Sequence, residues 1–520
     1  MALPASLSGL MDKAAYPHPC GRIELTETHI SWVLLTGDFA YKLKKPVRFS
    51  FLDFSTLALR EHYCREELRC NTAFAPELYM AVLPVYRHAD GALTLGEADG
   101  ELVDWAVQMH QFDPAAQLDR LLERNAVTTT MLAEFGHELA ARHASLPRLA
   151  GAANEAEQRY RGPVDDNFSE IATTQLQNTH ADLLATTRAL SDRLGDQLSA
   201  SFKARVEHGF VRECHGDLHL SNLVLLDKDK DGRKVTAFDC LEFNPNLRWI
   251  DTISDAAFLF MDCHERDRAD LAYAFLDAYL DASGDYRGAE LLSYFAAYRS
   301  VVRAKVAALR WEQEASAAAE SRFVQHMEWA KAWLERPPGR LILMCGLSGA
   351  GKSWVAERLA PLVPALRIRS DIARKALAGL ASLARTDSPV GGGLYAPRKS
   401  DEAFSFIADV TGPLLAGGEN VIVDATFIDY ARRAEFLELA NRAGVIARII
   451  YCDAPVEELR QRVTERMKRT TDPSEATPEV LEAQLQKFAL PKPPEPVLRI
   501  DTNKPIGDAE LRALADAVMA

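Results

Sequence analysis

A glycine-rich octapeptide at residues 346–353, GLSGAGKS, restricts what the second half of this chain can fold into more than any other sequence feature. It has the spacing G-x-x-x-x-G-K-[ST] and follows the apolar run LILMC at 341–345. A loop of this kind joins a buried strand to the first turn of a helix, where backbone N–H groups can surround phosphate oxygens. The octapeptide therefore predicts a parallel α/β sheet with a phosphate site at the end of one strand.

The residues of the octapeptide have separate tasks in this interpretation. Glycines let the backbone approach the phosphates, Lys352 brings a positive charge to the terminal phosphates, and the Ser353 hydroxyl can ligate Mg²⁺. A chance glycine-rich turn is the alternative, and the flanking strand and helix signals argue against it. The contacts expected with ATP come from Gly346, Ser348, Gly349, Ala350, Gly351, Lys352 and Ser353.

Two aspartates follow later apolar runs of the same half. Asp371 comes just after the strand expected over 366–369, where its carboxylate could accept a proton from an acceptor hydroxyl while Arg374 binds a phosphate. Asp424 ends the apolar run 420–424 and is placed to organise Mg²⁺. The alternatives are a helix N-cap with a first-turn acid at the first position and a turn-capping acid at the second.

Arg462 and Arg466 are spaced i, i+4 on a helix expected after the strand 446–452, so both lie on one helical face. Two neighbouring guanidinium groups repel each other unless an anion lies between them. The pair predicts a lid that clamps the phosphates of ATP, and a solvated helix face is the alternative.

Apolar strand candidates recur at 341–345, 366–369, 420–424, 446–452 and 497–501, with helical stretches between them. This alternation is typical of a parallel sheet covered by helices on both faces. Over about 340–505 the chain resembles P-loop small-molecule and nucleotide kinases, the group that contains gluconate kinases, polynucleotide 5′-kinases and zeta-toxin-like proteins. The resemblance implies ATP and Mg²⁺ as cofactors, Asp371 as the acceptor-side base and Arg374 as its phosphate-binding partner.

A second signature, HGDLHLSN, occupies residues 215–222 and has the H-x-D-x-x-x-x-N spacing of a kinase catalytic loop. Asp217 can accept the proton of an acceptor hydroxyl, while Asn222 can turn back toward a Mg²⁺ that bridges ATP phosphates. Asp239, near the end of the apolar run 235–240, is the expected second metal ligand. These residues predict another phosphotransfer site, and a degraded, inactive copy of the loop is the alternative.

The pattern H-G-D-x-H-x-x-N is the signature of aminoglycoside-phosphotransferase-like kinases, which include choline, fructosamine and homoserine kinases. Residues from about 20 to 330 resemble that superfamily. The resemblance implies a bilobal protein-kinase-like fold, with Asp217 as the catalytic base and Asn222 and Asp239 as Mg²⁺ ligands. The chain departs from the kinase pattern in lacking a G-x-G-x-x-G loop, since only Thr-Gly-Asp at 36–38 occupies that turn.

The same resemblance implies a strand lysine that holds the α- and β-phosphates of ATP and pairs with a helix glutamate. Lys42 and Lys44 share one face of the strand expected at 39–46, and we prefer Lys42. On the following helix we prefer Glu67 to Glu66 as the partner.

Two prolines and a glycine at 337–339 stop a helical pattern just before the run 341–345 and mark the best domain boundary. We expect a domain at 1–335, with a small lobe at about 20–110 and a helical lobe at about 111–335, and a P-loop domain at 340–520. The small lobe contains β-rich runs at 30–35 and 79–86, and 255–335 reads as successive helices. The fold class is thus α/β and α+β, a bilobal protein-kinase-like fold followed by a P-loop NTPase domain.

Composition narrows the class of protein. The formal net charge of −14 argues against a general nucleic-acid binder, and no apolar run approaches the ~18 residues of a membrane helix. We therefore expect a cytoplasmic location and no membrane partner, and the negative charge argues against nucleic acid as a partner. Acidic residues crowd 255–290, and a solvated helix face is the default interpretation there.

Taken together, the two signatures predict a bifunctional ATP- and Mg²⁺-dependent phosphotransferase, in which each domain transfers a γ-phosphoryl group to a hydroxyl of a small molecule. The combination resembles bacterial fusions of an aminoglycoside-phosphotransferase-like domain with a P-loop ATP-binding domain. Sugars, amino sugars and nucleotide sugars are the leading acceptor classes. The alternative is a regulatory or toxin–antitoxin-like nucleotide-binding protein with only one active site.

Overall fold

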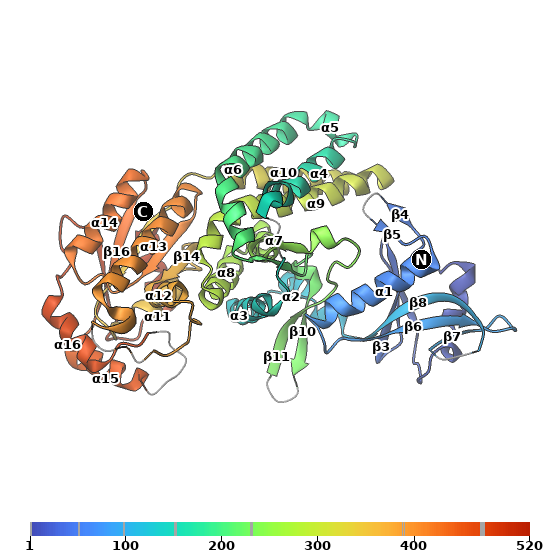
Figure 1. The fold of residues 1–520 in the computed structure, drawn as a ribbon, viewed down its shortest axis with the longest axis horizontal. Coiled ribbons are helices and arrows are strands. Elements are labelled where there is room, and N and C mark those ends of the chain that lie inside the picture. The colour runs from blue at the N-terminus through green and yellow to red at the C-terminus, as the bar shows by residue number, and fades with distance from the viewer. Residues whose placement is uncertain are drawn as a thin grey trace. The chain divides into compact units, whose positions relative to one another are not determined.

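The computed structural model describes residues 3–49, 52–96, 99–149, 153–228, 232–386, 388, 391–467 and 474–520. The chain folds into two compact units (Figure 1). The first comprises Met1–Val127, Leu146–Ala153 and Val206–Asp255, and the second comprises Thr128–Ser145, Asn154–Arg205 and Ala256–Ala520. Helices from the first half of the chain therefore fold together with the second half.

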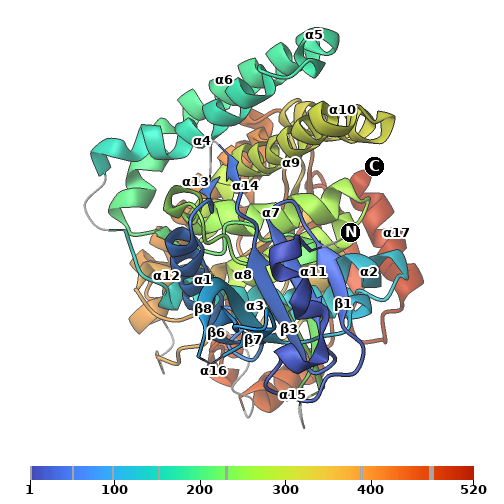
Figure 2. The same cartoon turned by 90° about the vertical axis from the view of Figure 1, so that its right-hand side faces the viewer.

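An antiparallel sheet with the strand order β1-β2-β3-β8-β6-β7 forms much of the first unit. Figure 2 labels β1, β3, β6, β7 and β8 of this sheet. Helix α1 (Leu57–Thr72) begins at Thr56, whose side chain accepts the N–H of Leu59, and it packs against β8. The β-rich runs and the helix expected in this region are confirmed. The strands are Glu24–Glu27 (β1), Ser31–Leu35 (β2), Phe39–Lys44 (β3), Tyr79–Arg87 (β6), Leu93–Leu95 (β7) and Glu101–His110 (β8).

The rest of the first unit contains two short strand pairs. Strand β9 (Val211–Glu213) pairs with β12 (Trp249–Asp251), and β10 (Leu223–Lys228) forms a hairpin with β11 (Gly232–Ala237). The segment between β9 and β10 ends in a 3₁₀ turn and carries the HGDLHLSN signature. The smaller elements of this unit are Arg48–Phe49 (β4), Leu52–Asp53 (β5) and Leu118–Glu123 (α2).

Helices dominate the amino-terminal part of the second unit, and the successive helices expected over 255–335 are confirmed. Helices α3 (Thr129–Ser145) and α8 (Ala269–Ser283) pack closely at Gly136, where a Cβ atom would lie 2.4 Å from the carbonyl oxygen of Phe275. The other helices are Ala156–Ile171 (α4), Leu176–Thr179 (α5), Ala181–Glu207 (α6), Thr252–Glu265 (α7), Leu292–Glu314 (α9) and Ala317–Leu334 (α10).

A five-stranded parallel sheet with the order β14-β15-β13-β16-β17 completes the second unit and confirms the predicted strand–helix alternation. Its strands are Leu341–Cys345 (β13), Ala365–Arg369 (β14), Asn420–Asp424 (β15), Ala447–Asp453 (β16) and Val497–Asp501 (β17). Its helices are Lys352–Leu359 (α11), Ser370–Leu377 (α12), Pro397–Ala416 (α13), Tyr430–Arg442 (α14), Val456–Arg466 (α15), Pro478–Lys487 (α16) and Asp508–Met519 (α17).

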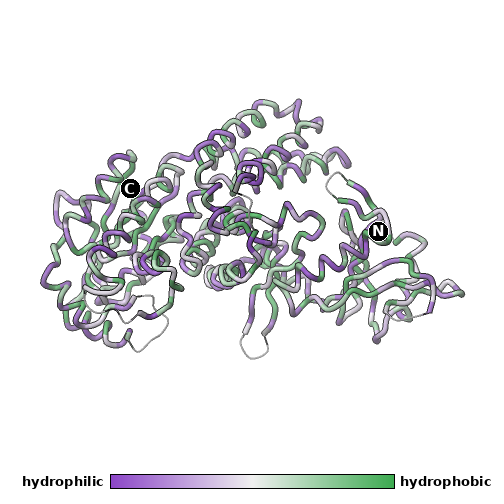
Figure 3. Tube along the Cα trace, viewed as in Figure 1, coloured by the Kyte–Doolittle hydropathy of each residue, from purple (hydrophilic) through white to green (hydrophobic). Residues whose placement is uncertain are grey.

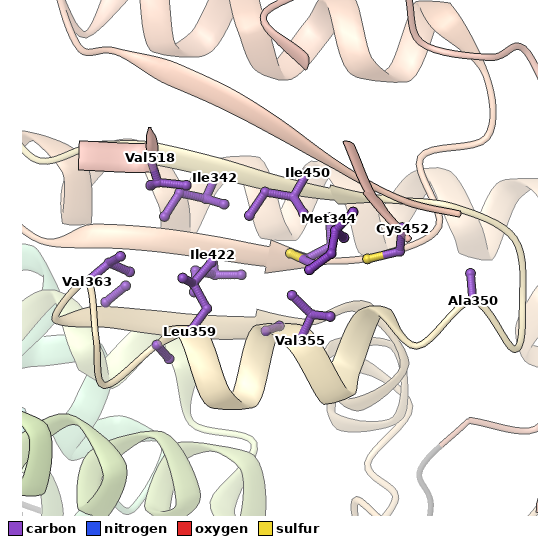
Figure 4. Close-up of a cluster of buried hydrophobic side chains, with 14 of the residues drawn as sticks. Ile342, Met344, Ala350, Val355, Leu359, Val363, Ile422, Ile450, Cys452 and Val518 are labelled. Carbon is purple, nitrogen blue, oxygen red and sulfur yellow. The ribbon is translucent and has the colours of Figure 1, made fainter. Parts of the chain in front are cut away.

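Strand β13 is central in this sheet, and all five of its side chains are buried. Figure 4 shows Ile342 and Met344 of this strand packed with Ile422 and Ile450 of its neighbours and with Val355 of α11. A central parallel strand is covered by helices on both faces, which explains its uninterrupted apolar sequence. This core holds the glycine-rich loop at the carboxyl end of β13.

Hydrophilic and hydrophobic stretches are interleaved along the chain in Figure 3. Among the helices that the structure describes, none has the combination of length and apolarity needed to cross a membrane.

The expectation of a solvated acidic face at 255–290 is wrong for much of that segment. Asp277 and Asp281 of α8 are buried, and each forms ion pairs with Arg367 of β14. Asp255 is also buried and accepts backbone hydrogen bonds within the first unit. Local sequence could not show this, because the arginine partners lie about ninety residues further along the chain.

Candidate active sites

The catalytic-loop signature forms a tight turn that places Asp217 beside Asn222. The Nδ2 group of Asn222 donates to Oδ2 of Asp217 at 3.0 Å and to its carbonyl oxygen at 2.9 Å. The Asp217 side chain is 40% exposed, so its carboxylate remains accessible to an acceptor hydroxyl. Because the amide nitrogen of Asn222 faces Asp217, its amide oxygen is the atom that can serve a cation.

Backbone interactions hold this turn. The Asp255 carboxylate accepts the N–H groups of His215 and Gly216 at 3.1 and 2.9 Å. Gly216 has a φ of +85°, and a Cβ atom there would lie 2.8 Å from the carbonyl oxygen of Leu247. This crowding explains why glycine stands where the kinase pattern has arginine. Burial lowers the pKa of His215, whose Nε2 lies 2.9 Å from the carbonyl oxygen of Phe238.

A buried charge cluster lies beside the turn and contains both candidate lysines. The Nζ atom of Lys42 lies 2.8 Å from Oε1 of Glu67 and 2.5 Å from Oδ1 of Asp239. Lys44 donates to Oε2 of Glu67 at 2.8 Å and also pairs with Glu242. Glu67 therefore serves both lysines, whereas only Lys42 reaches Asp239 among the ion pairs of the described residues.

The electrostatics of the cluster follow from its burial. Burial alone would raise the pKa of Glu67, but the ammonium groups of Lys42 and Lys44 outweigh it and lower that pKa. Glu66, the alternative helix glutamate, points elsewhere and pairs with Arg69 and Arg248. Glu242 was missed by sequence reasoning, because nothing in its local pattern distinguishes a buried ion-pair partner from a surface acid.

The donor set of this turn fits a divalent cation. Asp239 has a φ of +61°, a conformation that aspartate tolerates better than most residues, and its side chain is 44% exposed. A carboxylate from Asp239 and an amide oxygen from Asn222 are the hard oxygen ligands that Mg²⁺ prefers.

In the second unit, the glycine-rich loop curves tightly between β13 and α11. Gly346 has a φ of +145° and Gly349 a φ of +84°, and a Cβ atom at either would lie within 3 Å of a backbone oxygen. Lys352 begins α11, and its Nζ donates to the carbonyl oxygen of Leu347 at 2.9 Å. Burial lowers the pKa of Lys352. The loop N–H of Ser348 donates to Oε1 of Gln484 at 2.9 Å, a contact that sequence reasoning missed.

A cavity of about 880 Å³ opens beside this loop. Arg462 lies on its wall, where the guanidinium donates to Glu458 at 2.7 Å and to the carbonyl oxygen of Thr502 at 2.8 Å. Both predicted lid arginines thus border the cavity together with the loop. The lining also includes residues of the loop and the helix start, Arg369 of β14 and the second lid arginine, Arg466; these are Gly349, Gly351, Lys352, Ser353, Arg369 and Arg466. Helices α3 and α8 contribute His137, Asp281 and Ala282.

Ile372 of α12 lines this cavity, whereas Asp371 and Arg374, in the first turn and a half of the same helix, are not among its lining residues. Nη1 of Arg374 donates to Oδ1 of Asp371 at 2.8 Å. Tyr395 completes the group: its hydroxyl lies 3.4 Å from the same oxygen, and its ring centroid lies 4.7 Å from the Arg374 guanidinium carbon. Sequence reasoning missed Tyr395, which ends the short 3₁₀ turn Gly393–Tyr395 in a segment without a recognisable motif.

Asp424 lies at the end of β15 and is buried. Its Oδ2 atom has no hydrogen-bond partner among the residues that the structure describes, and the nearest ion-pair partner is Nε of Arg369 at 3.7 Å. A buried carboxylate oxygen without a donor is costly unless a cation neutralises it. Together with the Ser353 hydroxyl, Asp424 therefore offers an oxygen set that fits Mg²⁺.

Two family models match the chain. The model of the phosphotransferase enzyme family matches residues 52–292, and an AAA domain model matches residues 341–491. The chain joins a phosphotransferase-family domain to a P-loop kinase-like domain. This confirms the predicted fold class and the resemblance drawn from the two signatures. The phosphotransferase-family match contains the HGDLHLSN turn, and the P-loop match begins at the first residue of β13.

A relative spans most of both domains. An uncharacterized protein of Mycobacterium tuberculosis is 29% identical over 467 residues, which cover 89% of each chain. Among solved structures, a gluconokinase from Sinorhizobium meliloti is 21% identical, covers 36% of this chain and 94% of its own, and has a TM-score of 0.25. An ethanolamine kinase of Plasmodium vivax is 10% identical, covers 59% of this chain and 81% of its own, and has a TM-score of 0.36.

Proposed function

We propose that the protein is a bifunctional ATP- and Mg²⁺-dependent phosphotransferase with one active site in each domain. The observation that carries the proposal is the convergence of Lys42, Glu67, Asp217, Asn222 and Asp239 in the first unit, from segments as much as 197 residues apart. A buried lysine–glutamate pair beside an accessible aspartate and two oxygen ligands matches what phosphoryl transfer requires, which is positioning and charge neutralisation.

In the phosphotransferase-family domain, Asp217 would take the proton of the acceptor hydroxyl, and Asn222 keeps its carboxylate oriented. Lys42, fixed by Glu67, would contact the α- and β-phosphates of ATP. Asn222 and Asp239 would hold Mg²⁺, which neutralises phosphate charge when bound.

In the P-loop domain, the backbone N–H groups of 346–353 and Lys352 would bind the phosphates, with Arg462 and Arg466 closing over them. Asp371 would act as base toward the acceptor, and Arg374 would bind phosphate. Ser353 and Asp424 would hold Mg²⁺ in this site.

The acceptors in this proposal are small hydroxyl-bearing molecules, with sugars, amino sugars and nucleotide sugars as the first classes to test. The domain boundaries at 335 and 340, the cytoplasmic location and the absence of a nucleic-acid partner stay predictions.

The test is ³¹P NMR of ATP turnover by the wild type, Asp217→Asn and Lys352→Ala, against sugars, amino sugars, aminoglycosides and nucleotide sugars. Each variant has a matched control: Asp227→Asn, an exposed aspartate of β10, and Lys399→Ala, an exposed lysine of α13. We expect phosphomonoester signals that disappear in one catalytic variant and persist in its control. If both catalytic variants keep every ATP-dependent activity, two-site catalysis is wrong. If ATP binds and no acceptor is phosphorylated, the regulatory alternative replaces it.

A further inference from the structure

Helix α8, which belongs to the phosphotransferase-family match, packs against β14, the edge strand of the P-loop sheet (Figure 1). Four charged side chains meet at this contact: Asp277 and Asp281 from α8, and Arg367 and Arg369 from β14. All four are at least four-fifths buried, so each charge depends on its partners. A buried charge without a partner strongly destabilises the fold, so any shift that separates these aspartates from the arginines is costly.

The two aspartates have different partners. Among the described residues, the Asp277 side chain forms hydrogen bonds only with Arg367. Both of its carboxylate oxygens accept from Nε of Arg367, and Oδ1 also accepts the backbone N–H of Arg367. Asp281 accepts from Nη2 of Arg367 at 2.8 Å and from Nη1 of Arg369 at 3.3 Å. The Tyr286 hydroxyl also donates to Oδ1 of Asp281 at 2.8 Å, and it accepts the backbone N–H of Arg369 at 3.2 Å.

Arg369 connects this contact to the P-loop site. It lines the cavity beside the glycine-rich loop, and so does Asp281. Its Nε atom lies 3.7 Å from Oδ2 of Asp424, the buried oxygen without a hydrogen-bond partner. The guanidinium is therefore shared between two carboxylates, at hydrogen-bond distance from Asp281 and at a longer distance from Asp424.

We propose that Asp281 is a positioning residue of the P-loop site, holding Arg369 so that its guanidinium lines the cavity while Oδ2 of Asp424 is left for a divalent cation. This inference rests on the proposed function of the P-loop domain. It adds that α8, whose sequence lies in the phosphotransferase-family match, completes the P-loop site. Without the Asp281 charge, the Arg369 guanidinium would shift toward Asp424, which it already approaches to 3.7 Å, and would compete there with the metal.

The test is Mn²⁺ binding in the presence of ADP, followed by electron paramagnetic resonance, in the full chain carrying Asp239→Asn so that the other metal site is silenced. We expect Asp281→Asn to weaken Mn²⁺ affinity about tenfold, the size typical of residues that orient a metal ligand. Asp277→Asn is the matched control: it alters the same helix and the same Arg367 but does not touch Arg369, so Mn²⁺ affinity should stay at the level of the parent. Adding Arg369→Gln to Asp281→Asn should restore the affinity.

The outcomes are separable. If the parent binds no Mn²⁺ with ADP at the P-loop site, the proposed function of that domain and this inference both fail. If the parent binds Mn²⁺ but Asp281→Asn and Asp277→Asn weaken it equally, the effect is structural and only this inference fails. If Asp281→Asn does not fold, Arg369→Gln alone decides: the inference requires Mn²⁺ affinity equal to or above that of the parent, because the competing guanidinium is gone, and a lower affinity overturns it.

Discussion

The two candidate lysines of β3 offer a direct test of how the phosphotransferase-family site is built. Both pair with Glu67, but Lys44 is fully buried with Glu242 as its second partner, whereas Lys42 has Asp239, whose side chain is 44% exposed. The substitutions Lys42→Met and Lys44→Met should therefore have opposite profiles of stability and activity.

The magnitudes follow from what each substitution leaves behind. Lys44→Met leaves Glu242 buried without a counter-charge, and breaking such a pair costs about 3–5 kcal/mol. Lys42→Met leaves Glu67 paired with Lys44 and leaves Asp239 to water, so we expect a loss of about 1.5–3 kcal/mol, as for a hydrogen bond to a charged group. Lys42→Met should also lower turnover at this site about a hundredfold, the effect of removing one preorganised donor.

The assay combines urea unfolding with titration of ATP binding, in a Lys352→Ala background that removes the P-loop site. Lys44→Met should bind ATP with near-normal affinity at temperatures where it is folded, whereas Lys42→Met should be folded and bind ATP poorly. If folded Lys44→Met loses ATP binding while Lys42→Met keeps it, the assignment of the two lysines is reversed and the reasoning from exposure is refuted.

Three further predictions concern single residues. Gly216→Ala should destabilise the first unit by about 1–3 kcal/mol and abolish its activity, because alanine is strained at φ +85° and would press on Leu247; an unfolding midpoint equal to the wild type contradicts this. Because burial lowers the pKa of His215, the unfolded chain is protonated there to a greater extent than the folded protein below the ordinary value of 6.5. The free energy of unfolding should therefore fall from pH 7 toward pH 5, and urea titrations should show a shallower fall in His215→Gln. Tyr395→Phe should slow acceptor phosphorylation at the P-loop site about threefold with unchanged thermal stability, since it removes one weak hydrogen bond to Asp371, and equal rates would remove Tyr395 from the site.

The elements of the P-loop domain were predictable because their signals are local. Strands at 341–345, 420–424 and 497–501 were expected at the residues where they occur, and the other two differ by one residue at their ends. A buried parallel strand is an uninterrupted apolar run, and a phosphate loop has fixed residue types at fixed spacing, so both can be read from neighbouring residues alone.

The candidate sites were predictable only in part. The turn that joins Asp217 to Asn222 follows from their spacing, and the fold places them together. The choice between Lys42 and Lys44 stayed open in the sequence, since both side chains face the same way from one strand. Their different second partners, Asp239 and Glu242, are set by how the chain returns to β3 almost two hundred residues later.

The amino-acid sequence by itself determined the two signatures, the strand–helix alternation and the residue types available for phosphate and metal. Only the tertiary structure decided which acidic residues of α8 are buried and what they neutralise. A row of aspartates on a helix has the same pattern whether water or arginines face it, and Arg367 lies 86 residues beyond Asp281. Burial of charge depends on partners brought together by packing, and packing is a property of the whole chain rather than of any segment of it.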